Sequence, residues 1–187
     1  MILYPTETLY ALGVNALDFQ EIEKILLLKG RDENKPSSWL VRSLADIEHY
    51  GELTEVARKI ATRFLPGPLT LILEAKNKVP EHRRKFYNEV SFRISSDPIA
   101  QKVVAEFMQE YDAPLTCTSA NVSGLSTLST VGEIQQQFGE KAKMITKIID
   151  DGPRKGLAST IVRVVDDTVS ILREGEITEK EILSVIA

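Results

Sequence analysis

Residues 114–124 read PLTCTSANVSG, and this stretch indicates the fold class. Residues 115–118 are typical of a short buried strand, and polar residues follow it at once. In open α/β sheets, ligands bind at the carboxyl ends of the strands. Ser119 and Asn121 could donate hydrogen bonds to an anion there, and Ala120 would keep the backbone accessible. The alternative interpretation is that Ser and Asn only stabilise a turn.

Strand-like and helix-like runs alternate on both sides of this stretch. Hydrophobic patterning predicts further strands at residues 2–4, 39–41, 69–73, 89–94, 144–149, 160–165 and 169–173. Helices are predicted at residues 98–111 and after the capping residues Asp18, Thr54, Thr130 and Thr178. Glu21, Glu133 and Glu181 are placed to complete capping boxes. The alternation predicts one α/β domain over residues 1–187, a mixed twisted sheet with flanking helices.

The composition is that of an ordinary globular protein, with 43% hydrophobic and 27% charged residues. No signal peptide is visible, and no apolar run reaches the ~18 residues that a membrane helix needs. The single cysteine excludes an internal disulfide and fits a reducing compartment. We therefore expect a cytoplasmic protein without membrane association. The net charge of −4 argues against broad, charge-driven binding of nucleic acid, although a local basic face is compatible with weak RNA binding.

Two cations lie close together in the segment KGRDENKP, which begins at Lys29. Lys29 and Arg31 are two residues apart just after a predicted helix, so an extended backbone would place both on one side. Such a pair could neutralise adjacent phosphates, with the arginine binding two oxygens at once. Lys35 lies in the same segment and is a further candidate for nucleotide contact. The alternative is a solvated helix end, where cations favourably meet the helix dipole.

Other candidate ligands lie where predicted strands begin or end. Thr6 in the segment PTET could bind a small polar ligand and Tyr10 could wall its pocket, or this segment could instead be a capped helix entry. Arg93 and Arg173 follow strands and could bind a carboxylate or phosphate, or form surface ion pairs of little energetic value. Ser159 opens a strand after a glycine-flanked loop. The segment PGPLT, residues 66–70, is interpreted as a turn scaffold without direct chemistry.

Several kinds of site are not indicated by the sequence. There is no Walker or Rossmann glycine motif, and His49 and His82 lack metal-ligand spacing. Cys117 lies in a predicted buried strand, which favours core packing over a nucleophilic role. No hydrolase-like pairing of nucleophile and base is present. The pattern favours a site that holds a nucleoside triphosphate and a small polar molecule, where placement and charge neutralisation drive the reaction.

Seven segments occur in an order that resembles the YrdC-like family, the L-threonylcarbamoyladenylate synthases, in their short single-domain form. They are YPTETLYALG, KGRDENKP, PGPLTLIL, VSFRISSDP, PLTCTSANVSG, ASTIV and ILREG, and they extend over residues 4–175. The resemblance implies synthesis of threonylcarbamoyl-AMP and pyrophosphate from L-threonine, bicarbonate or CO2, and ATP. It also implies Mg²⁺ without protein metal ligands. Partner proteins would transfer the threonylcarbamoyl group to an adenosine of tRNAs that read codons beginning with A.

The resemblance also implies roles for individual residues. The catalytic, phosphate-binding set would be Lys29, Arg31, Ser119 and Asn121. ATP would further contact Lys35, Ala120 and Arg173. The threonine pocket would be formed by Thr6, Tyr10, Arg93, Thr118 and Ser159. An N-carboxylate made from threonine's amine would attack the α-phosphorus of ATP, with no protein base identified.

Some positions depart from the family pattern. Ala11 replaces a usual glycine, Asp32 replaces a proline beside the phosphate-binding cations, and RISSDP replaces an Arg-x-Pro pattern. A second hypothesis is therefore a non-catalytic RNA-binding or ribosome-associated module on the same fold. A third is a carbamoyl-transfer domain like those of hydrogenase-maturation proteins. The sequence contains none of the additional domains that the third hypothesis requires.

Overall fold

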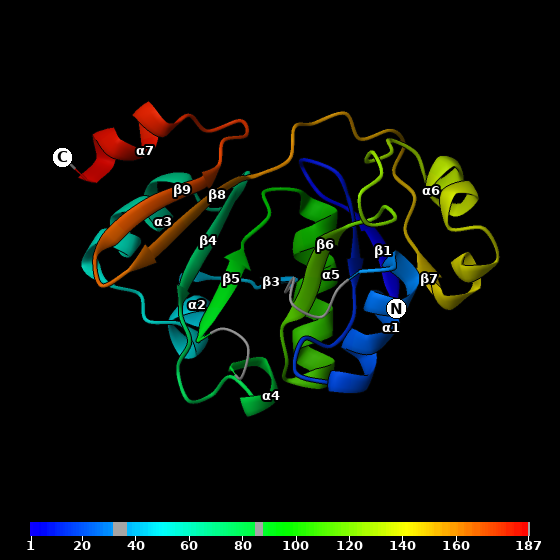
Figure 1. The fold of residues 1–187 in the computed structure, drawn as a ribbon, viewed down its shortest axis with the longest axis horizontal. Helices are drawn as coiled ribbons and strands as arrows, with labels where there is room; N and C mark the ends of the chain where they lie inside the picture. The colour runs from blue at the N-terminus through cyan, green and yellow to red at the C-terminus, as the bar shows by residue number, and fades with distance from the viewer. Residues whose placement is uncertain (32–36, 85–87, 187) are drawn as a thin grey trace.

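A mixed sheet forms the centre of the computed structural model, which describes residues 1–31, 37–84 and 88–186 (Figure 1). Its strands are β1 (Ile2–Pro5), β2 (Tyr10–Gly13), β3 (Ser38–Leu40), β4 (Leu69–Glu74), β5 (Glu89–Arg93), β6 (Leu115–Ser119), β7 (Lys147–Ile148), β8 (Thr160–Val165) and β9 (Thr168–Arg173). Within the described residues, their order is β7-β1-β2-β6-β3-β5-β4-β8-β9. Neighbouring strands pair antiparallel except β7 with β1, β3 with β5 and β4 with β8.

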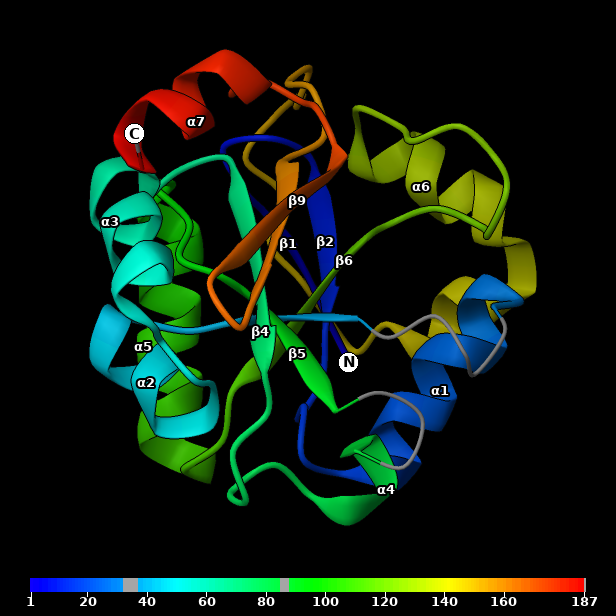
Figure 2. The same cartoon turned by 60° about the vertical axis from the view of Figure 1, so that its left-hand side comes forward.

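Helices cover the sheet on both sides. They are α1 (Phe19–Lys29), α2 (Leu44–Tyr50), α3 (Glu55–Phe64), α4 (Glu81–Arg84), α5 (Pro98–Tyr111), α6 (Val131–Phe138) and α7 (Glu179–Ile186), with a 3₁₀ helix at Gly139–Met144. Figure 2 shows α2, α3 and α5 on one side of the strands and α1 and α6 on the other. Among the described residues, no helix is both long and apolar enough to cross a lipid bilayer.

The core divides into two clusters that lie against different parts of the sheet. The larger one includes Trp39, Leu71 and Phe92, all fully buried, together with residues of α3 and α5. The smaller one contains residues of β1, β2, α1 and α6, among them Leu12 and Ile25. Strands β4, β5 and β8 therefore bury one of their two faces against helices, and the opposite face is left for another use.

Most of the predicted elements are confirmed. The capping box of Thr130 and Glu133 is present, and so is that of Thr178 and Glu181. The turn between β8 and β9 contains Asp166 at a positive φ of 49°. Short aspartate side chains tolerate this left-handed backbone conformation, which explains the turn.

Some predictions about the elements were wrong. The capping box predicted at Asp18 is incomplete, because Glu21 contacts Lys24 and the Asp18 amide donates to the Asn15 carbonyl. The strand predicted at residues 144–149 is confined to two residues, Lys147–Ile148. Strand β2 and helices α2 and α4 were not predicted. Because they are short, they show too little hydrophobic periodicity to be recognised.

Candidate active site

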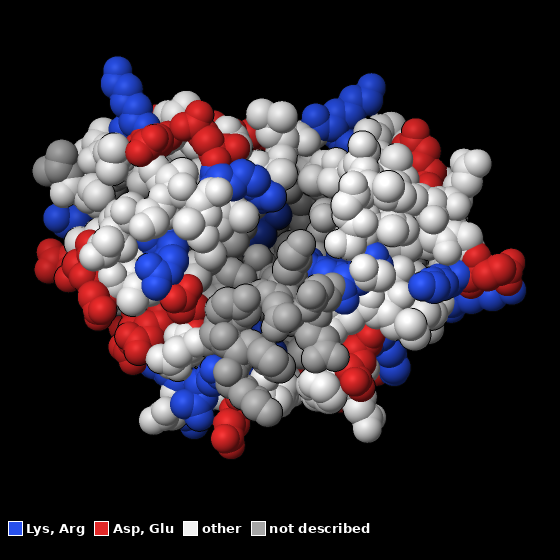
Figure 3. All heavy atoms as spheres, in the orientation of Figure 1, with Lys and Arg blue, Asp and Glu red and all other residues white. Residues whose placement is uncertain are grey.

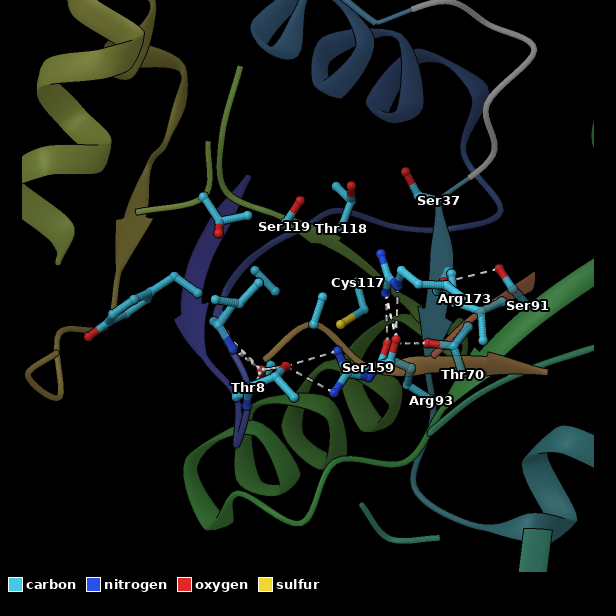
Figure 4. Close-up of a pocket in the computed structure, with 18 of the residues that line it drawn as sticks. Thr8, Ser37, Thr70, Ser91, Arg93, Cys117, Thr118, Ser119, Ser159 and Arg173 are labelled. Atoms are coloured by element: carbon cyan, nitrogen blue, oxygen red, sulfur yellow. Dashed lines mark hydrogen bonds between the residues drawn. The ribbon is translucent and has the colours of Figure 1, made fainter. Parts of the chain in front are cut away.

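A cleft with a volume of about 300 Å³ opens on the polar face of β3, β4, β5 and β8. Its walls include Thr8, Ser37, Thr70, Ser91, Arg93, Cys117, Thr118, Ser119, Ser159 and Arg173 (Figure 4). Strand alternation explains why the cleft is polar. Leu71 and Phe92 point into the core, so their neighbours Thr70, Ser91 and Arg93 face the cleft.

Arg93 is held at the base of the cleft by a buried ion pair. Its Nη2 contacts the carboxylate of Glu7, and the two side chains are only 9% and 14% exposed. Glu7 also accepts a hydrogen bond from Ser95, while the Arg93 guanidinium donates to Thr8 Oγ1 over 3.2 and 3.3 Å. The Arg93 Nε is buried and has no hydrogen-bond partner in the described part of the chain. The surface ion pair considered for Arg93 is therefore not what the structure shows, because the observed pair is buried.

A second arginine orients the hydroxyl groups on another wall. Arg173 donates from Nε and Nη2 to the Ser159 carbonyl, over 3.0 and 2.8 Å. Ser159 Oγ lies 2.8 Å from Thr70 Oγ1, so two buried hydroxyls share one hydrogen bond. Burial, followed by the positive charge of Arg93, lowers the pKa of Arg173. The charge of Arg93 therefore acts on Arg173, and an anion bound near both guanidinium groups would be favoured.

The turn after β6 is organised by cations from the end of α1. Arg31 lines the cleft and donates to Thr118 Oγ1 over 3.0 Å. Lys29 is 2% exposed and lies behind the turn, where its Nζ contacts the Ser119 carbonyl and, over 2.8 Å, the Asn121 carbonyl. The Asn121 side chain accepts from Ser119 Oγ over 2.6 Å. Lys29 therefore stabilises the turn that presents Thr118 and Ser119 to the cleft.

The charge on Lys29 is sensitive to its surroundings. Burial, followed by the positive charge of Arg31, lowers the pKa of Lys29 to about 7. A bound anion near this turn would raise that pKa again, because an opposite charge favours the protonated form.

Some polar groups of the turn between β1 and β2 form hydrogen bonds that stabilise the backbone. Thr6 Oγ1 donates to the Leu9 carbonyl over 2.7 Å and accepts from the Leu9 amide over 3.1 Å. The Tyr10 ring is buried, and its hydroxyl donates to the Gly152 carbonyl over 2.8 Å. The Tyr10 hydroxyl therefore anchors the loop that follows β7. No helix begins at this segment, so the capped helix entry considered for it was wrong.

Positive charge dominates the described part of the cleft. Arg31, Arg93 and Arg173 line it, and none of the described lining residues is Asp or Glu. Figure 3 shows Lys and Arg atoms on both sides of the hollow in the middle of this face. This local excess of positive charge contrasts with the net charge of −4 for the whole chain. The described residues contain no group of three His, Cys, Asp or Glu side chains that could hold a metal ion.

The structure brings most of the predicted site residues together. Thr6, Tyr10, Arg31, Arg93, Thr118, Ser119, Ser159 and Arg173 all line the cleft. Lys29, Ala120 and Asn121 lie behind its wall, all less than 10% exposed. Lys35 lies outside the described residues, as does Asp32.

Four further residues of the site were missed by the sequence reasoning. Thr8, Thr70 and Ser91 contribute hydroxyls to the cleft, and Glu7 is the counter-charge of Arg93. Thr70 lies in the PGPLT segment, which was interpreted as scaffold only. Its place in a strand that alternates Leu-Thr-Leu was the available signal, because the polar residue must face away from the core. Glu7 gave no local signal, since its partner is 86 residues away in the chain.

Comparison with known proteins reveals relatives over nearly the whole chain. The family named Sua5_yciO_yrdC and described as "Telomere recombination" matches residues 1–175. A "Putative threonylcarbamoyl-AMP synthase" of Methanocaldococcus jannaschii is 38% identical over 95% of this chain and 80% of its own length. A "Threonylcarbamoyl-AMP synthase" of Pyrococcus abyssi is 33% identical over 100% of this chain. The chain spans only 53% of the Pyrococcus abyssi protein.

Solved structures agree with these sequence relatives. The structure of P. abyssi Sua5 complexed with L-threonine superposes with a TM-score of 0.87 at 33% identity, over 99% of this chain and 53% of that chain. The E. coli YciO structure superposes with a TM-score of 0.81 at 26% identity, over 97% of this chain and 85% of that chain. Both matches extend through the sheet and the cleft described above.

Proposed function

This chain belongs to the Sua5–YciO–YrdC family, and we propose that it is a threonylcarbamoyl-AMP synthase. It forms threonylcarbamoyl-AMP and pyrophosphate from L-threonine, bicarbonate or CO2, and ATP. The observation that carries the proposal is the convergence of Arg31, Arg93 and Arg173 on one hydroxyl-lined cleft with no described carboxylate in its lining. All three substrates carry, or readily form, negatively charged oxygen groups that such a cleft would bind.

Threonine binds in the part of the cleft formed by Arg93, Thr8, Thr70 and Ser159. The guanidinium group of Arg93 pairs with the substrate carboxylate while it keeps its contact with Glu7, so two carboxylates share one guanidinium group. The hydroxyl pair of Thr70 and Ser159, 2.8 Å apart, offers hydrogen bonds to the substrate hydroxyl or amine. Arg173 keeps this pair in place through its hydrogen bonds to the Ser159 carbonyl.

The triphosphate binds at the turn after β6. Arg31 and the Thr118 hydroxyl donate to phosphate oxygens there, and the Ser119 hydroxyl would join them by turning away from Asn121 Oδ1, to which it donates in this structure. Lys29 acts from behind, because its ammonium group fixes the two carbonyls that shape the turn. When the nucleotide binds, the added negative charge raises the Lys29 pKa and strengthens the positive potential of the turn.

The reaction then follows from placing the substrates together. Threonine's amine combines with CO2 to give an N-carboxylate and a proton, or with bicarbonate with loss of water. A carboxylate oxygen of this intermediate attacks the α-phosphorus of ATP, and the bond to pyrophosphate breaks. The arginines stabilise the charge that develops on the phosphoryl and leaving-group oxygens. The N-carboxylate is already negatively charged, so it can attack without a protein base. This is consistent with the described lining, which contains no carboxylate or histidine.

The site also fits a magnesium ion that enters with the nucleotide. Mg²⁺ usually keeps several waters and binds substrate phosphates rather than a full cage of protein ligands. Because the described lining offers hydroxyl and guanidinium groups and no carboxylate, such an ion would be coordinated mainly by phosphate oxygens and water. When bound, it would supply further neutralisation of the triphosphate charge. Partner proteins would then transfer the threonylcarbamoyl group from the product to tRNA adenosine.

Product identification tests this proposal. Purified protein would be incubated with Mg-ATP, L-threonine and isotopically labelled bicarbonate, and the nucleotides analysed by mass spectrometry. We expect a threonylcarbamoyl-AMP species that carries the label, and no such species from an Arg93→Ala variant. Detection of AMP alone, or of a product without the label, would refute the proposed reaction.

A further inference from the structure

A fourth arginine lies next to the cleft without an assigned role. Arg83 belongs to α4, and its guanidinium carbon lies 5.9 Å from the ring centre of Trp39. Trp39 is fully buried in β3, so this contact fixes where the guanidinium group points. The Arg83 Nη2 lies 3.5 Å from the carbonyl of Ser37, which is a lining residue of the cleft. Its Nε is buried and has no hydrogen-bond partner among the residues that the structure describes.

Within the described ranges, Arg83 has no acidic partner. None of the ion pairs found among the described residues includes Arg83. Burial, followed by the positive charge of Arg31, lowers the pKa of Arg83. Because the charge of Arg31 acts on Arg83, an anion bound near both guanidinium groups would offset the repulsion between them. The stacking on Trp39 keeps Arg83 in place without neutralising its charge.

The neighbouring arginine shows that this is not a general feature of α4. Arg84 Nε donates to the Val79 carbonyl over 3.0 Å, and its Nη1 donates to Asn77 Oδ1 over 3.2 Å. Those bonds hold Arg84 within its own loop. Arg84 therefore offers a matched control with the same charge, the same helix and different contacts.

The position of Ser37 indicates which part of the nucleotide Arg83 would meet. Strand β3 pairs antiparallel with β6, with Ser38 opposite Cys117, so the register continues with Ser37 opposite Thr118. Figure 4 shows Ser37, Thr118 and Ser119 along one side of the cleft and Thr8, Arg93 and Thr70 along the other. Arg83 therefore adjoins the side assigned above to the triphosphate, away from the threonine pocket.

We propose that Arg83, together with Arg31, binds the pyrophosphate end of the nucleotide. This inference rests on the proposed function for the identity of the nucleotide. Arg83 would hold the two terminal phosphates of ATP and stabilise the charge that accumulates on pyrophosphate as it leaves. It would contribute little to binding of AMP, which lacks those phosphates.

Calorimetric titration of pyrophosphate and of AMP, each with Mg²⁺, tests the inference without requiring turnover. The proteins would be the wild type, Arg83→Gln, Arg83→Lys and the control Arg84→Gln. We expect Arg83→Gln to weaken pyrophosphate binding by roughly tenfold, the loss typical of one charge-assisted hydrogen-bonding group. Arg83→Lys should lie between, because a lysine keeps the charge but cannot bind two oxygens in the same way. Arg84→Gln should bind like the wild type, and AMP binding should not change in any variant.

The fluorescence of Trp39, the chain's one tryptophan, gives an independent readout of location. Pyrophosphate should change the emission of Trp39 in the wild type. The reason is that the guanidinium group over the ring would move, or its charge would be offset by the bound anion. The change should be much smaller in Arg83→Gln. Thermal unfolding of each variant would show that all of them are folded.

Two results would overturn the inference. One is pyrophosphate binding by Arg83→Gln that equals that of Arg84→Gln, and the other is an equal loss of AMP and pyrophosphate binding in Arg83→Gln. Failure of the proposed function gives a different result. In that case the wild type would release no pyrophosphate from ATP, while its own pyrophosphate binding would still depend on Arg83.

Discussion

Replacing Glu7 by Gln should remove the counter-charge of Arg93 while preserving the size of the side chain. Both members of this pair are nearly buried, at 14% and 9% exposed. Removing one partner of a buried ion pair leaves an uncompensated charge and typically costs about 3–5 kcal/mol. The bonds from the Arg93 guanidinium to Thr8 remain in the variant. We therefore expect a loss near the lower end, about 3 kcal/mol in the free energy of unfolding.

The assay is urea-induced unfolding at neutral pH, with Glu140→Gln as the control. Glu140 pairs with Lys143, but these side chains are 89% and 79% exposed. The cost of losing such an exposed pair should be below about 1 kcal/mol. Both variants should retain the wild-type dependence on denaturant, because the surface exposed on unfolding is the same. A Glu7→Gln variant that loses no more stability than Glu140→Gln would refute the assignment of a buried, structurally important pair.

Threonine connects this prediction with the proposed substrate site. If Arg93 pairs with the substrate carboxylate, L-threonine should stabilise Glu7→Gln more than it stabilises the wild type. The reason is that the ligand then supplies the missing counter-charge and binds the variant more tightly. At a given ligand concentration, a ligand that binds the folded state more tightly stabilises it more. The measurement is the unfolding midpoint with increasing L-threonine, and D-threonine serves as the control ligand. Equal shifts in both proteins would argue against the pairing.

The remaining predictions concern charge and close packing around the same cleft. Lys29→Met should flatten the pH dependence of stability. The pKa of Lys29 is about 7 in the folded protein and ordinarily 10.5, so between these pH values the unfolded chain binds one more proton than the folded chain. Wild-type stability therefore rises with pH in this window, by up to about 1.4 kcal/mol per pH unit. Parallel unfolding curves for wild type and variant across this window would contradict the depressed pKa. Gly175→Ala should lower the unfolding free energy by roughly 1–3 kcal/mol, because its Cβ would lie 2.1 Å from the Ala158 carbonyl oxygen. Gly132→Ala in α6, whose added Cβ would meet no atom of the described residues within 4 Å, should leave the unfolding free energy equal or higher. Arg31→Ala should abolish ATP turnover and leave the unfolding midpoint near the wild-type value, and turnover at the wild-type rate would remove Arg31 from the phosphate site.

Local signals explain why much of the fold could be predicted from the sequence. The capping box of Thr130 and Glu133 is encoded within four residues and needs no tertiary contact to be recognised. The same applies to the turn at Asp166 and to the alternation in β4 and β5. Helix α2 has an equally local capping box, formed by Ser43 and Asp46, but its short apolar pattern did not draw attention to it.

The roles of charged residues were less predictable, because they depend on contacts between distant segments. Lys29 and Asn121 were expected to contact phosphates directly, whereas the structure places them behind the cleft wall and joins them to each other. The two residues are 92 positions apart in the chain, so no local pattern could reveal the bond between them. Arg93 was identified correctly as a charged residue at a strand end. Its counter-charge Glu7 lies in the turn between β1 and β2, far from Arg93 in the sequence. Direct contact of Lys29 and Asn121 with phosphate stays a prediction.

If this cleft joins threonine, bicarbonate and ATP, the protein must release pyrophosphate from ATP only when the other two substrates are present. Release would be measured at fixed Mg²⁺ with ATP alone, with each co-substrate singly and with both. We predict release that requires both L-threonine and bicarbonate and is lost in Arg31→Ala. Folded protein that releases no pyrophosphate under any of these conditions, or releases it equally without threonine, would rule out threonylcarbamoyl-AMP synthesis in this cleft. Salt-sensitive RNA binding without any release of pyrophosphate would instead support the non-catalytic module.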